Sequence, residues 1–424
     1  MKIGIVLVPA LFFACVNAQA QPAPQPQAMG RQQGPPSPVV QPDSRVTFNL
    51  LAPNATAVTV TGDYPIGTDI PMTKDDKGVW SVTVGPLRED FYAYHFTVDG
   101  VTTLDPRNVH IQRDTTHFSN WAVVPGPDTA NYEVNDVPHG RVAAVWYPSP
   151  SLKLTRRALI YTPPSYETST VRYPVLYLLH GGAGDEDQWN DLGRATEIIE
   201  NLIDQGKAVP MIVVMGNGNA WETMTPSALS DPPVVLMPNS AGPQGAGTAT
   251  QGLTNYPDSI VTDLIPYVDK NFRTKSAPQD RAIAGLSMGG AQSAQAAFAH
   301  PEQFGWVGLF SSAAPLLPGC LKRIPMPADS ASRRGPGLGM TIDPDGFMKQ
   351  YPAIGPGLNH RFKLLYLAVG RSDGLVESED DLVKLLNDHG VTIVTHDLPD
   401  YGHDWNFWRV ILEDFSARLF KAGK

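Results

Sequence analysis

Apolar and polar residues alternate over short runs in the first third of the chain. Residues 45–50, 57–61, 80–84 and 92–98 each follow this two-residue period, which predicts strands with one face in a core. Asp99-Gly100 follows the fourth run and is a hairpin-turn signal. Short strands separated by turns are typical of a small β-sandwich, so residues 45–124 are predicted to form one such domain.

A different pattern begins at residue 156. Continuous apolar runs of strand length alternate with longer segments of helical spacing, which predicts an α/β domain with a mostly parallel sheet. The predicted strands span residues 157–161, 175–179, 211–215, 281–284, 307–311, 362–369 and 392–396. The predicted helices span residues 194–205, 259–271, 288–300, 377–389 and 405–421. Residues 132–150 are interpreted as a connector, and the α/β domain is assigned to residues 144–424.

The first 43 residues are predicted to lie outside both domains. Residues 1–20 have the pattern of a secretory signal peptide, because Lys2 precedes an apolar run that is too short to cross a bilayer and Ala18-Gln19-Ala20 resembles a cleavage site. A buried N-terminal strand is the alternative. Residues 21–43 are rich in Pro and Gln and are predicted to be a disordered or extended linker. We therefore expect a secreted or periplasmic protein.

Two Pro- and Gly-rich insertions interrupt the α/β pattern at residues 219–256 and 315–356. Insertions of this length in a compact domain are often lids or walls of a substrate pocket. A plain surface insertion is the alternative for each of them.

Composition and charge narrow the range of partners and cofactors. The chain has 424 residues, of which 42% are hydrophobic and 17% charged, with a formal net charge of −10 and no block of Lys and Arg. This argues against nucleic acid and anionic membranes as partners. Removal of residues 1–20 leaves Cys320 as the single cysteine, which excludes an intrachain disulfide. No metal-binding motif is found, so neither metal nor cofactor is expected, and the oligomeric state stays open.

Gly285-Leu286-Ser287-Met288-Gly289-Gly290 lies between a short apolar run and an Ala-rich helical segment. A serine on a sharp turn between strand and helix, flanked by glycines, is the pattern of a nucleophile elbow. Gly is needed two residues before and after the serine because larger side chains would collide with the neighbouring strand and helix. The helix N-terminus also favours negative charge developing nearby. Ser287 is therefore the predicted nucleophile.

A nucleophilic serine needs a base, and the base needs an orienting acid. His403 follows the last predicted strand and precedes the last predicted helix, so we predict it to be the base, with a surface-turn histidine as the alternative. Asp373 follows the strand predicted at 362–369, at an edge of the sheet where active-site residues gather, and is the predicted acid. The rival acids are Glu377, Asp397 and Asp400.

The predicted oxyanion donors are two backbone N–H groups. One is that of Gly182, in the glycine-rich loop after the strand at 175–179, and the other is that of Met288, directly after the nucleophile. His180 is interpreted as a structural residue beneath this loop. Trp189 and Trp405 are predicted to contact substrate, with core packing as the alternative for Trp189.

Four segments together resemble the esterase-D-like branch of the α/β-hydrolases: residues 179–182, 285–290, 370–373 and 402–405. This branch includes feruloyl and acetylxylan esterases of carbohydrate esterase family one and enterochelin-type esterases. The resemblance covers residue 144 to the end of the chain. It implies an α/β-hydrolase fold and serine ester hydrolysis by Ser287, Asp373 and His403, with oxyanion donors near Gly182 and Met288.

The N-terminal domain resembles glycogen-binding-type, immunoglobulin-like early-set modules. The similar residues are Gly78-Val79-Trp80, the segment 96–100 and Asp105-Pro106. The resemblance implies a module that often precedes the catalytic domain of bacterial feruloyl esterases. We expect it to pack on the α/β domain and to shape the substrate cleft.

These observations predict a secreted serine carboxylesterase acting on acylated plant polysaccharide, foremost a feruloyl esterase. An acetylxylan or small-acyl esterase and an enterochelin-type siderophore esterase are the alternative activities. A carbohydrate-binding protein with an inactive hydrolase domain is the alternative from a different class.

Overall fold

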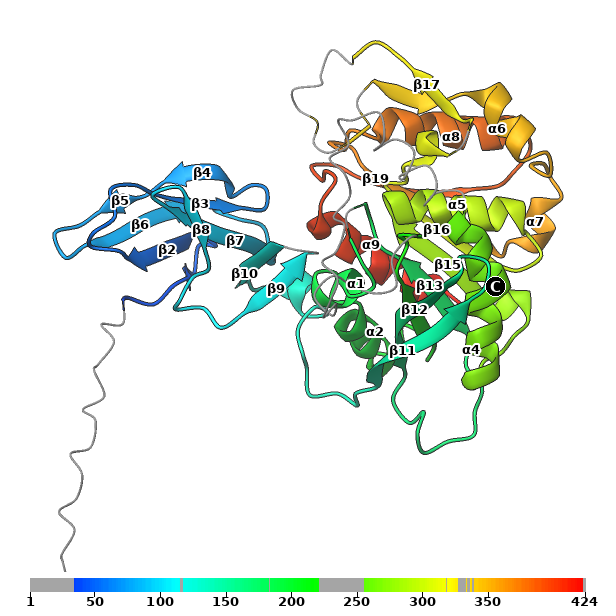
Figure 1. The fold of residues 1–424 in the computed structure, drawn as a ribbon, viewed down its shortest axis with the longest axis horizontal. Helices are drawn as coiled ribbons and strands as arrows, with labels where there is room; N and C mark the ends of the chain where they lie inside the picture. Colours follow the sequence, from blue (N-terminus) through cyan, green and yellow to red (C-terminus); the bar gives the residue numbers. More distant parts are fainter. Residues whose placement is uncertain are drawn as a thin grey trace, which may run out of the picture.

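The computed structural model describes residues 34–114, 117–182, 184–220, 255–317, 319–326, 333, 336–337 and 339–421. The predicted signal peptide, most of the predicted linker and nearly all of the first insertion lie outside these residues. The described chain forms a β-sandwich followed by an α/β domain, as the sequence predicted, and Figure 1 shows the two side by side.

Two antiparallel sheets make up the sandwich domain (residues 34–124). The first sheet has the strand order β1 (Val39–Val40), β2 (Val46–Leu51), β6 (Val79–Val84) and β5 (Thr73–Lys74). The second has the order β4 (Gly67–Pro71), β3 (Val58–Gly62), β7 (Asp90–Val98), β10 (His117–Val124) and β9 (Ile111–Asp114), and β8 (Val101–Thr103) also pairs with β7. Strand β2 buries every second residue, so its alternating sequence supplies one wall of the core.

The α/β domain (residues 141–421) is built on an eight-stranded sheet. Its strand order is β11 (Arg141–Ser149), β12 (Leu154–Thr162), β14 (Ile212–Gly216), β13 (Val175–Leu179), β15 (Arg281–Leu286), β16 (Trp306–Phe310), β19 (Leu364–Gly370) and β20 (Val394–Leu398). The pairs β11–β12 and β12–β14 are antiparallel, and the other pairs are parallel. The carboxyl ends of β15, β19 and β20 therefore lie along one edge of the sheet.

Helices cover both faces of this sheet (Figure 1). One face packs against α4 (Ile265–Asn271), α5 (Met288–Ala299), α6 (Pro344–Gln350), α7 (Leu358–Arg361) and α8 (Val376–Asp388). The other packs against α1 (Gln188–Asp191), α2 (Ala195–Asp204) and α9 (Trp405–Arg418). Strand β13 is buried at every residue because its side chains enter the two cores in turn, which explains its continuous apolar sequence.

Several elements differ from the sequence predictions. The predicted connector at 132–150 contains the nine-residue strand β11, which lies at the edge of the sheet with most side chains exposed and so lacks an apolar pattern. The predicted linker at 21–43 contains β1, which pairs with β2, so ordered structure begins before residue 45. The helix predicted at 259–271 is already helical at residues 255–259, and a π-helical turn, Ile260–Leu264, lies within it. The second insertion contains α6 and the hairpin of β17 (Leu321–Arg323) and β18 (Met340–Ile342).

Strands β8, β9 and β10 of the sandwich domain were also missed by the sequence analysis, which ended its strand pattern at residues 102–106. Strand β9 is four residues long and β8 three, and β10 begins with two exposed residues and buries the polar Asn120, so their apolar periodicity is weak. Strand β9 nevertheless lies against α1 of the α/β domain. The sandwich domain thus contacts the α/β domain close to the loop that follows β13.

Candidate active site

Ser287 occupies the turn between β15 and α5 in a backbone conformation that side chains rarely adopt. Its φ and ψ are 51° and −115°, which projects the hydroxyl out of the turn. A Cβ at Gly285 would lie 2.5 Å from the backbone of Gly289, and a Cβ at Gly289 would lie 2.5 Å from the carbonyl oxygens of Leu179 and His180. Any side chain at these two positions would therefore collide with neighbouring backbone, as expected from the sequence.

His403 connects the serine to an acidic residue. Its Nε2 lies 3.0 Å from Ser287 Oγ, and its Nδ1 lies 2.9 Å from Asp373 Oδ2. The ring packs edge-on against Trp408, with 5.0 Å between ring centroids. His403 precedes α9, and the Asp404 carboxylate caps that helix by accepting a hydrogen bond from Phe407 N–H at 3.1 Å. The cap and the tryptophan together hold the imidazole in its orientation.

Asp373 is fully buried at the end of β19. Its Oδ1 accepts a hydrogen bond from Leu375 N–H at 2.8 Å, while Oδ2 faces His403, so both carboxylate oxygens have a donor. The rival acids lie elsewhere: Asp397 is ion-paired with Arg371 at 3.2 Å, Glu377 with Arg333 at 3.4 Å, and Asp400 is exposed. Of the four candidate acids, the structure brings only Asp373 to His403.

Gly182 and Met288, the predicted oxyanion donors, both lie near Ser287. Met288 is the first residue of α5, where the backbone N–H has no partner within the helix. Gly182 lines the same cavity as Ser287. A Cβ at the neighbouring Gly181 would lie 2.5 Å from Leu286 Cδ1, so the glycine-rich loop packs closely against the serine turn.

His180 is a buried structural residue beneath this loop, as the sequence analysis proposed. Its Nε2 accepts a hydrogen bond from Gly218 N–H at 2.7 Å, which leaves Nδ1 as the protonated nitrogen, 2.7 Å from the carbonyl oxygen of Gly181. Burial lowers the pKa of His180, in keeping with a neutral ring.

A cavity of about 280 Å³ opens over Ser287 and His403. Gly181, Gly182, Gln188, Leu286, Asp404, Trp405 and Trp408 line it from the α/β domain. Two further lining residues, Asp63 and Asp114, come from the sandwich domain. These two carboxylates were missed by the sequence analysis, because nothing in the residues around them indicates a contact with a site more than 100 positions away.

The two predicted substrate-contacting tryptophans have different positions. Trp405 lines the cavity. Trp189 is buried in the core instead, where its Nε1 donates a hydrogen bond to the Leu179 carbonyl at 2.8 Å and its ring packs edge-on against Trp405. The expected substrate contact of Trp189 is therefore corrected to a packing role.

Burial changes the ionisation of two carboxyl groups near the site. It raises the pKa of Asp63 to about 6, helped by Asp404 and Asp90, while the N–H of Ala93 and the charge of Arg409 act in the lowering direction. Burial also raises the pKa of Glu379, on α8, well above its usual range, and the nearby charge of Asp373 adds to this effect.

The described residues show neither a metal-binding cluster nor a helix that could cross a membrane. No group of three or more His, Cys, Asp or Glu within them is arranged to hold a metal ion. None of the helices that the structure describes is both long and apolar enough to cross a bilayer. Cys320 is fully buried.

Each of the two domains matches the model of a known protein family. Residues 149–335 match the family model described as "Putative esterase", and residues 37–122 match carbohydrate-binding module 48, the isoamylase N-terminal domain. The chain carries an esterase-family domain preceded by a carbohydrate-binding module of family 48. The α/β domain is called the esterase domain below, and the sandwich domain the module.

Relatives and solved structures agree with this assignment. An endo-1,4-beta-xylanase/feruloyl esterase of Xylanibacter ruminicola is 33% identical over 286 residues, covering 66% of this chain and 36% of the relative, so the chain spans about a third of that protein. A ferulic acid esterase of Anaeromyces mucronatus has a TM-score of 0.52 at 20% identity, covering 70% of this chain and 96% of that one. The enterobactin esterase of Shigella flexneri has a TM-score of 0.60 at 16% identity, covering 88% and 92%. At these identities the two solved structures show a shared fold, and the α/β-hydrolase prediction is confirmed.

Proposed function

We propose that the protein is a secreted serine ester hydrolase that releases hydroxycinnamate, foremost ferulate, from acylated plant polysaccharide. One observation carries the chemistry: a single imidazole lies within hydrogen-bond distance of both Ser287 Oγ, at 3.0 Å, and Asp373 Oδ2, at 2.9 Å. The esterase-family match and the xylanase/feruloyl esterase relative support the choice of ester and substrate class. The module of a carbohydrate-binding family supports a glycan ester.

In the proposed reaction, Ser287 Oγ attacks the ester carbonyl carbon while His403 Nε2 takes its proton. Asp373 accepts a hydrogen bond from Nδ1 and stabilises the imidazolium. The N–H groups of Gly182 and Met288 stabilise the oxyanion of the tetrahedral intermediate. When the intermediate collapses, the bond to the alcohol breaks and His403 gives its proton to the departing sugar oxygen. Water then attacks the acyl-enzyme with His403 as base and releases the acid.

Export is the second part of the proposal. It rests on the sequence of residues 1–20, which lie outside the described residues. Expression of the full chain with a mass measurement of the mature protein tests it. The expected mature chain begins at Gln21, whereas an intact Met1 on an exported protein would contradict it.

Three alternatives are distinguished by substrate and by mutation. Acetylxylan or another small-acyl ester and a siderophore ester of the enterobactin type use the same catalytic groups, and the enterobactin esterase fold extends over both domains. An inactive hydrolase domain that only binds carbohydrate would hydrolyse none of these esters.

The test compares initial rates on methyl ferulate, acetylated xylan and enterobactin. Wild-type protein is expected to be fastest on methyl ferulate, and Ser287→Ala to lower kcat by about 10⁶-fold, the size found when a serine nucleophile is removed. Ser416→Ala is the matched control, because Ser416 is a buried serine on α9 that does not line the cavity. A higher rate on acetylated xylan or enterobactin would show that this ester, and not a ferulate ester, is the preferred substrate. Equal rates for wild type and Ser287→Ala would contradict the proposal that the protein is a serine hydrolase.

A further inference from the structure

A second cavity lies next to the catalytic cavity, between the module and the esterase domain. Its volume is about 680 Å³, and it shares three lining residues with the catalytic cavity: Asp63, Asp114 and Trp405. The two cavities are therefore adjacent, and the second one extends from the shared side chains along β7 and β10 of the module. A substrate ester bound at Ser287 therefore has its remainder within reach of the module.

The side chains of this second cavity suit a neutral, polyhydroxylated ligand. Thr61, His95, Gln112, His117 and Ser119 contribute further hydrogen-bonding groups from the module. Phe118, on the same strand as His117, leaves 53% of its surface exposed and offers a flat apolar face. Carboxylates accept hydrogen bonds from hydroxyl groups, and an aromatic ring packs on the apolar face of a sugar, so the combination fits glycosyl units. The carboxylates Asp63 and Asp114 also disfavour an anionic ligand.

We propose that this interdomain cavity binds the glycosyl part of the substrate, with Asp63 as a hydroxyl acceptor and Phe118 as a stacking surface. The proposal rests on the proposed function, because it assumes an ester whose alcohol is a sugar. The module then contributes to catalysis directly, by holding the leaving group beside His403.

The experiment compares two esters of the same acid, methyl ferulate and a feruloylated xylan oligosaccharide. Asp63→Ala and Phe118→Ala are expected to lower kcat/KM for the oligosaccharide ester by about tenfold, the range of one lost hydrogen bond to a charged group or one lost ring contact. Methyl ferulate lacks the sugar, so its kcat/KM is expected to stay within about twofold in Phe118→Ala, because Phe118 lines the second cavity and not the catalytic one. Trp146→Ala is the control, because Trp146 is 48% exposed on β11, at the far edge of the esterase sheet.

The outcomes separate this proposal from the proposed function. If wild-type protein hydrolyses neither ester, the proposed function fails and this proposal falls with it. If it hydrolyses both and Phe118→Ala changes both rates equally, or neither rate, the cavity does not bind the glycosyl part. Phe118→Ala keeps the test valid should Asp63→Ala fold poorly, because Phe118 is on the surface.

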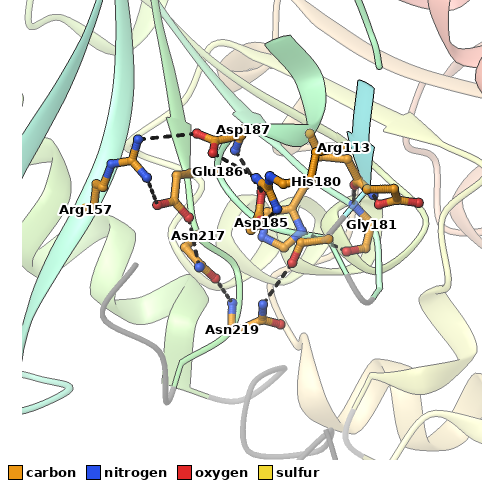
Figure 2. Close-up of polar contacts among 12 residues, drawn as sticks. Arg113, Arg157, His180, Gly181, Asp185, Glu186, Asp187, Asn217 and Asn219 are labelled. Carbon is orange, nitrogen blue, oxygen red and sulfur yellow. Dashed lines mark hydrogen bonds and ion pairs between the residues drawn. The ribbon is translucent and has the colours of Figure 1, made fainter. Parts of the chain in front are cut away.

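A different set of contacts joins the module to the loop that carries Gly182. Arg113, at the end of β9, donates two hydrogen bonds to the Asp185 carboxylate, at 2.7 and 3.0 Å, and one to Asp187 at 2.8 Å. Figure 2 shows the guanidinium of Arg113 beside these carboxylates. The Arg113 and Asp185 side chains are 9% and 2% exposed, so this bidentate pair is nearly free of solvent screening.

The next residue of β9 reaches the same loop. Asp114 accepts a hydrogen bond from Gln188 Nε2 at 2.8 Å, and Gln188 Oε1 accepts one from the N–H of Gly181 at 3.2 Å.

On the opposite side the loop is held within the esterase domain. Arg157 pairs with Glu186 at 3.2 Å, and Asn219 donates to the Gly184 carbonyl at 2.9 Å (Figure 2).

We infer that Arg113 is a positioning residue for the oxyanion hole: the module fixes the loop so that the N–H of Gly182 faces the developing oxyanion. A displacement of a donor by about 1 Å is enough to cost about a hundredfold in rate. Arg113→Ala is therefore expected to lower kcat on methyl ferulate by about a hundredfold, with KM nearly unchanged. Arg113→Lys keeps the charge without the bidentate geometry, so its kcat is expected to lie between those of wild type and Arg113→Ala.

A boronic acid inhibitor gives a readout that a purely structural role would not change. Its adduct with Ser287 is tetrahedral and carries oxygen in the oxyanion hole, so its affinity is expected to fall in parallel with kcat, whereas inhibition by ferulate should not change. Asp90→Asn is the matched control, because Asp90 forms another buried ion pair across the same interface, with Arg409 at 2.8 Å, away from the loop. Unchanged kcat and boronate affinity in Arg113→Ala would overturn the inference, as would an equal loss in Asp90→Asn.

Discussion

At the scale of single residues, Gly289 and Gly182 show that glycines in the two active-site loops are needed for different reasons. A Cβ at Gly289 would overlap backbone carbonyl oxygens of the β13 end, whereas one at Gly182 would meet no atom within 4 Å. Gly289→Ala is therefore expected to lower the free energy of unfolding by about 3 kcal/mol, and Gly182→Ala to leave it nearly unchanged. Urea denaturation of both variants measures this, and equal midpoints would contradict the steric account.

Asp63 gives a prediction that depends on pH. Because burial raises its pKa from 3.8 to about 6 in the folded protein, the folded state holds the proton more tightly than the unfolded state between these values. The contribution of Asp63 to stability therefore falls as pH rises from about 4 to about 6 and is constant above. The stability of Asp63→Asn relative to wild type should increase over that window, as measured by urea midpoints at pH 4.5, 5.5 and 7. A difference that does not change with pH would contradict it.

Sequence could identify the three catalytic candidates because each belongs to a local pattern. Ser287 lies in a glycine-flanked turn, and Asp373 and His403 each follow a predicted strand. Their convergence then follows from the order of strands in a parallel sheet. Arg113 and Asp114 have no such local signal, because their importance depends on how two domains pack, which the residues around them do not determine.

At the scale of elements, the cap of α9 links stability to the position of the catalytic base. Asp404 accepts hydrogen bonds from Phe407 N–H at 3.1 Å and Gly402 N–H at 3.3 Å, on both sides of His403. Asp404→Ala is expected to lower the free energy of unfolding by about 1 kcal/mol, and Asp404→Ser to lower it less because serine also caps helices. Thermal unfolding of the two variants tests this, and the same melting temperature for both would count against a capping role.

Strands with two buried faces were predicted well and most edge strands were missed, although the edge strand β20 was predicted, two residues too early. Strand β13 is apolar throughout because both of its faces are covered, and its predicted bounds match those of the structure. Strand β11 pairs along one side only and exposes most of its side chains, so its sequence resembles a connector. The sequence pattern follows burial, and strands that gain their stability from backbone pairing leave little trace in it.

At the scale of the whole molecule, the two domains are joined by a buried ion pair. Arg409 Nη1 lies 2.8 Å from Asp90 Oδ1, and both side chains are 2% exposed. Arg409→Ala leaves a carboxylate buried without its partner and is expected to lower the free energy of unfolding by about 3–5 kcal/mol. The double variant Asp90→Leu/Arg409→Met, which removes both charges, should recover most of the loss. Denaturation of the single and double variants tests this, and a double variant no more stable than Arg409→Ala would contradict it.

The measurement that tests the central claim most directly is covalent labelling of the protein with a fluorophosphonate, followed by peptide mass spectrometry. We expect one adduct per chain, located on Ser287, and labelling at least about a hundredfold slower in His403→Ala, because the base is needed to activate the hydroxyl. An adduct at another residue, or undiminished labelling of Ser287 in His403→Ala, would contradict the account.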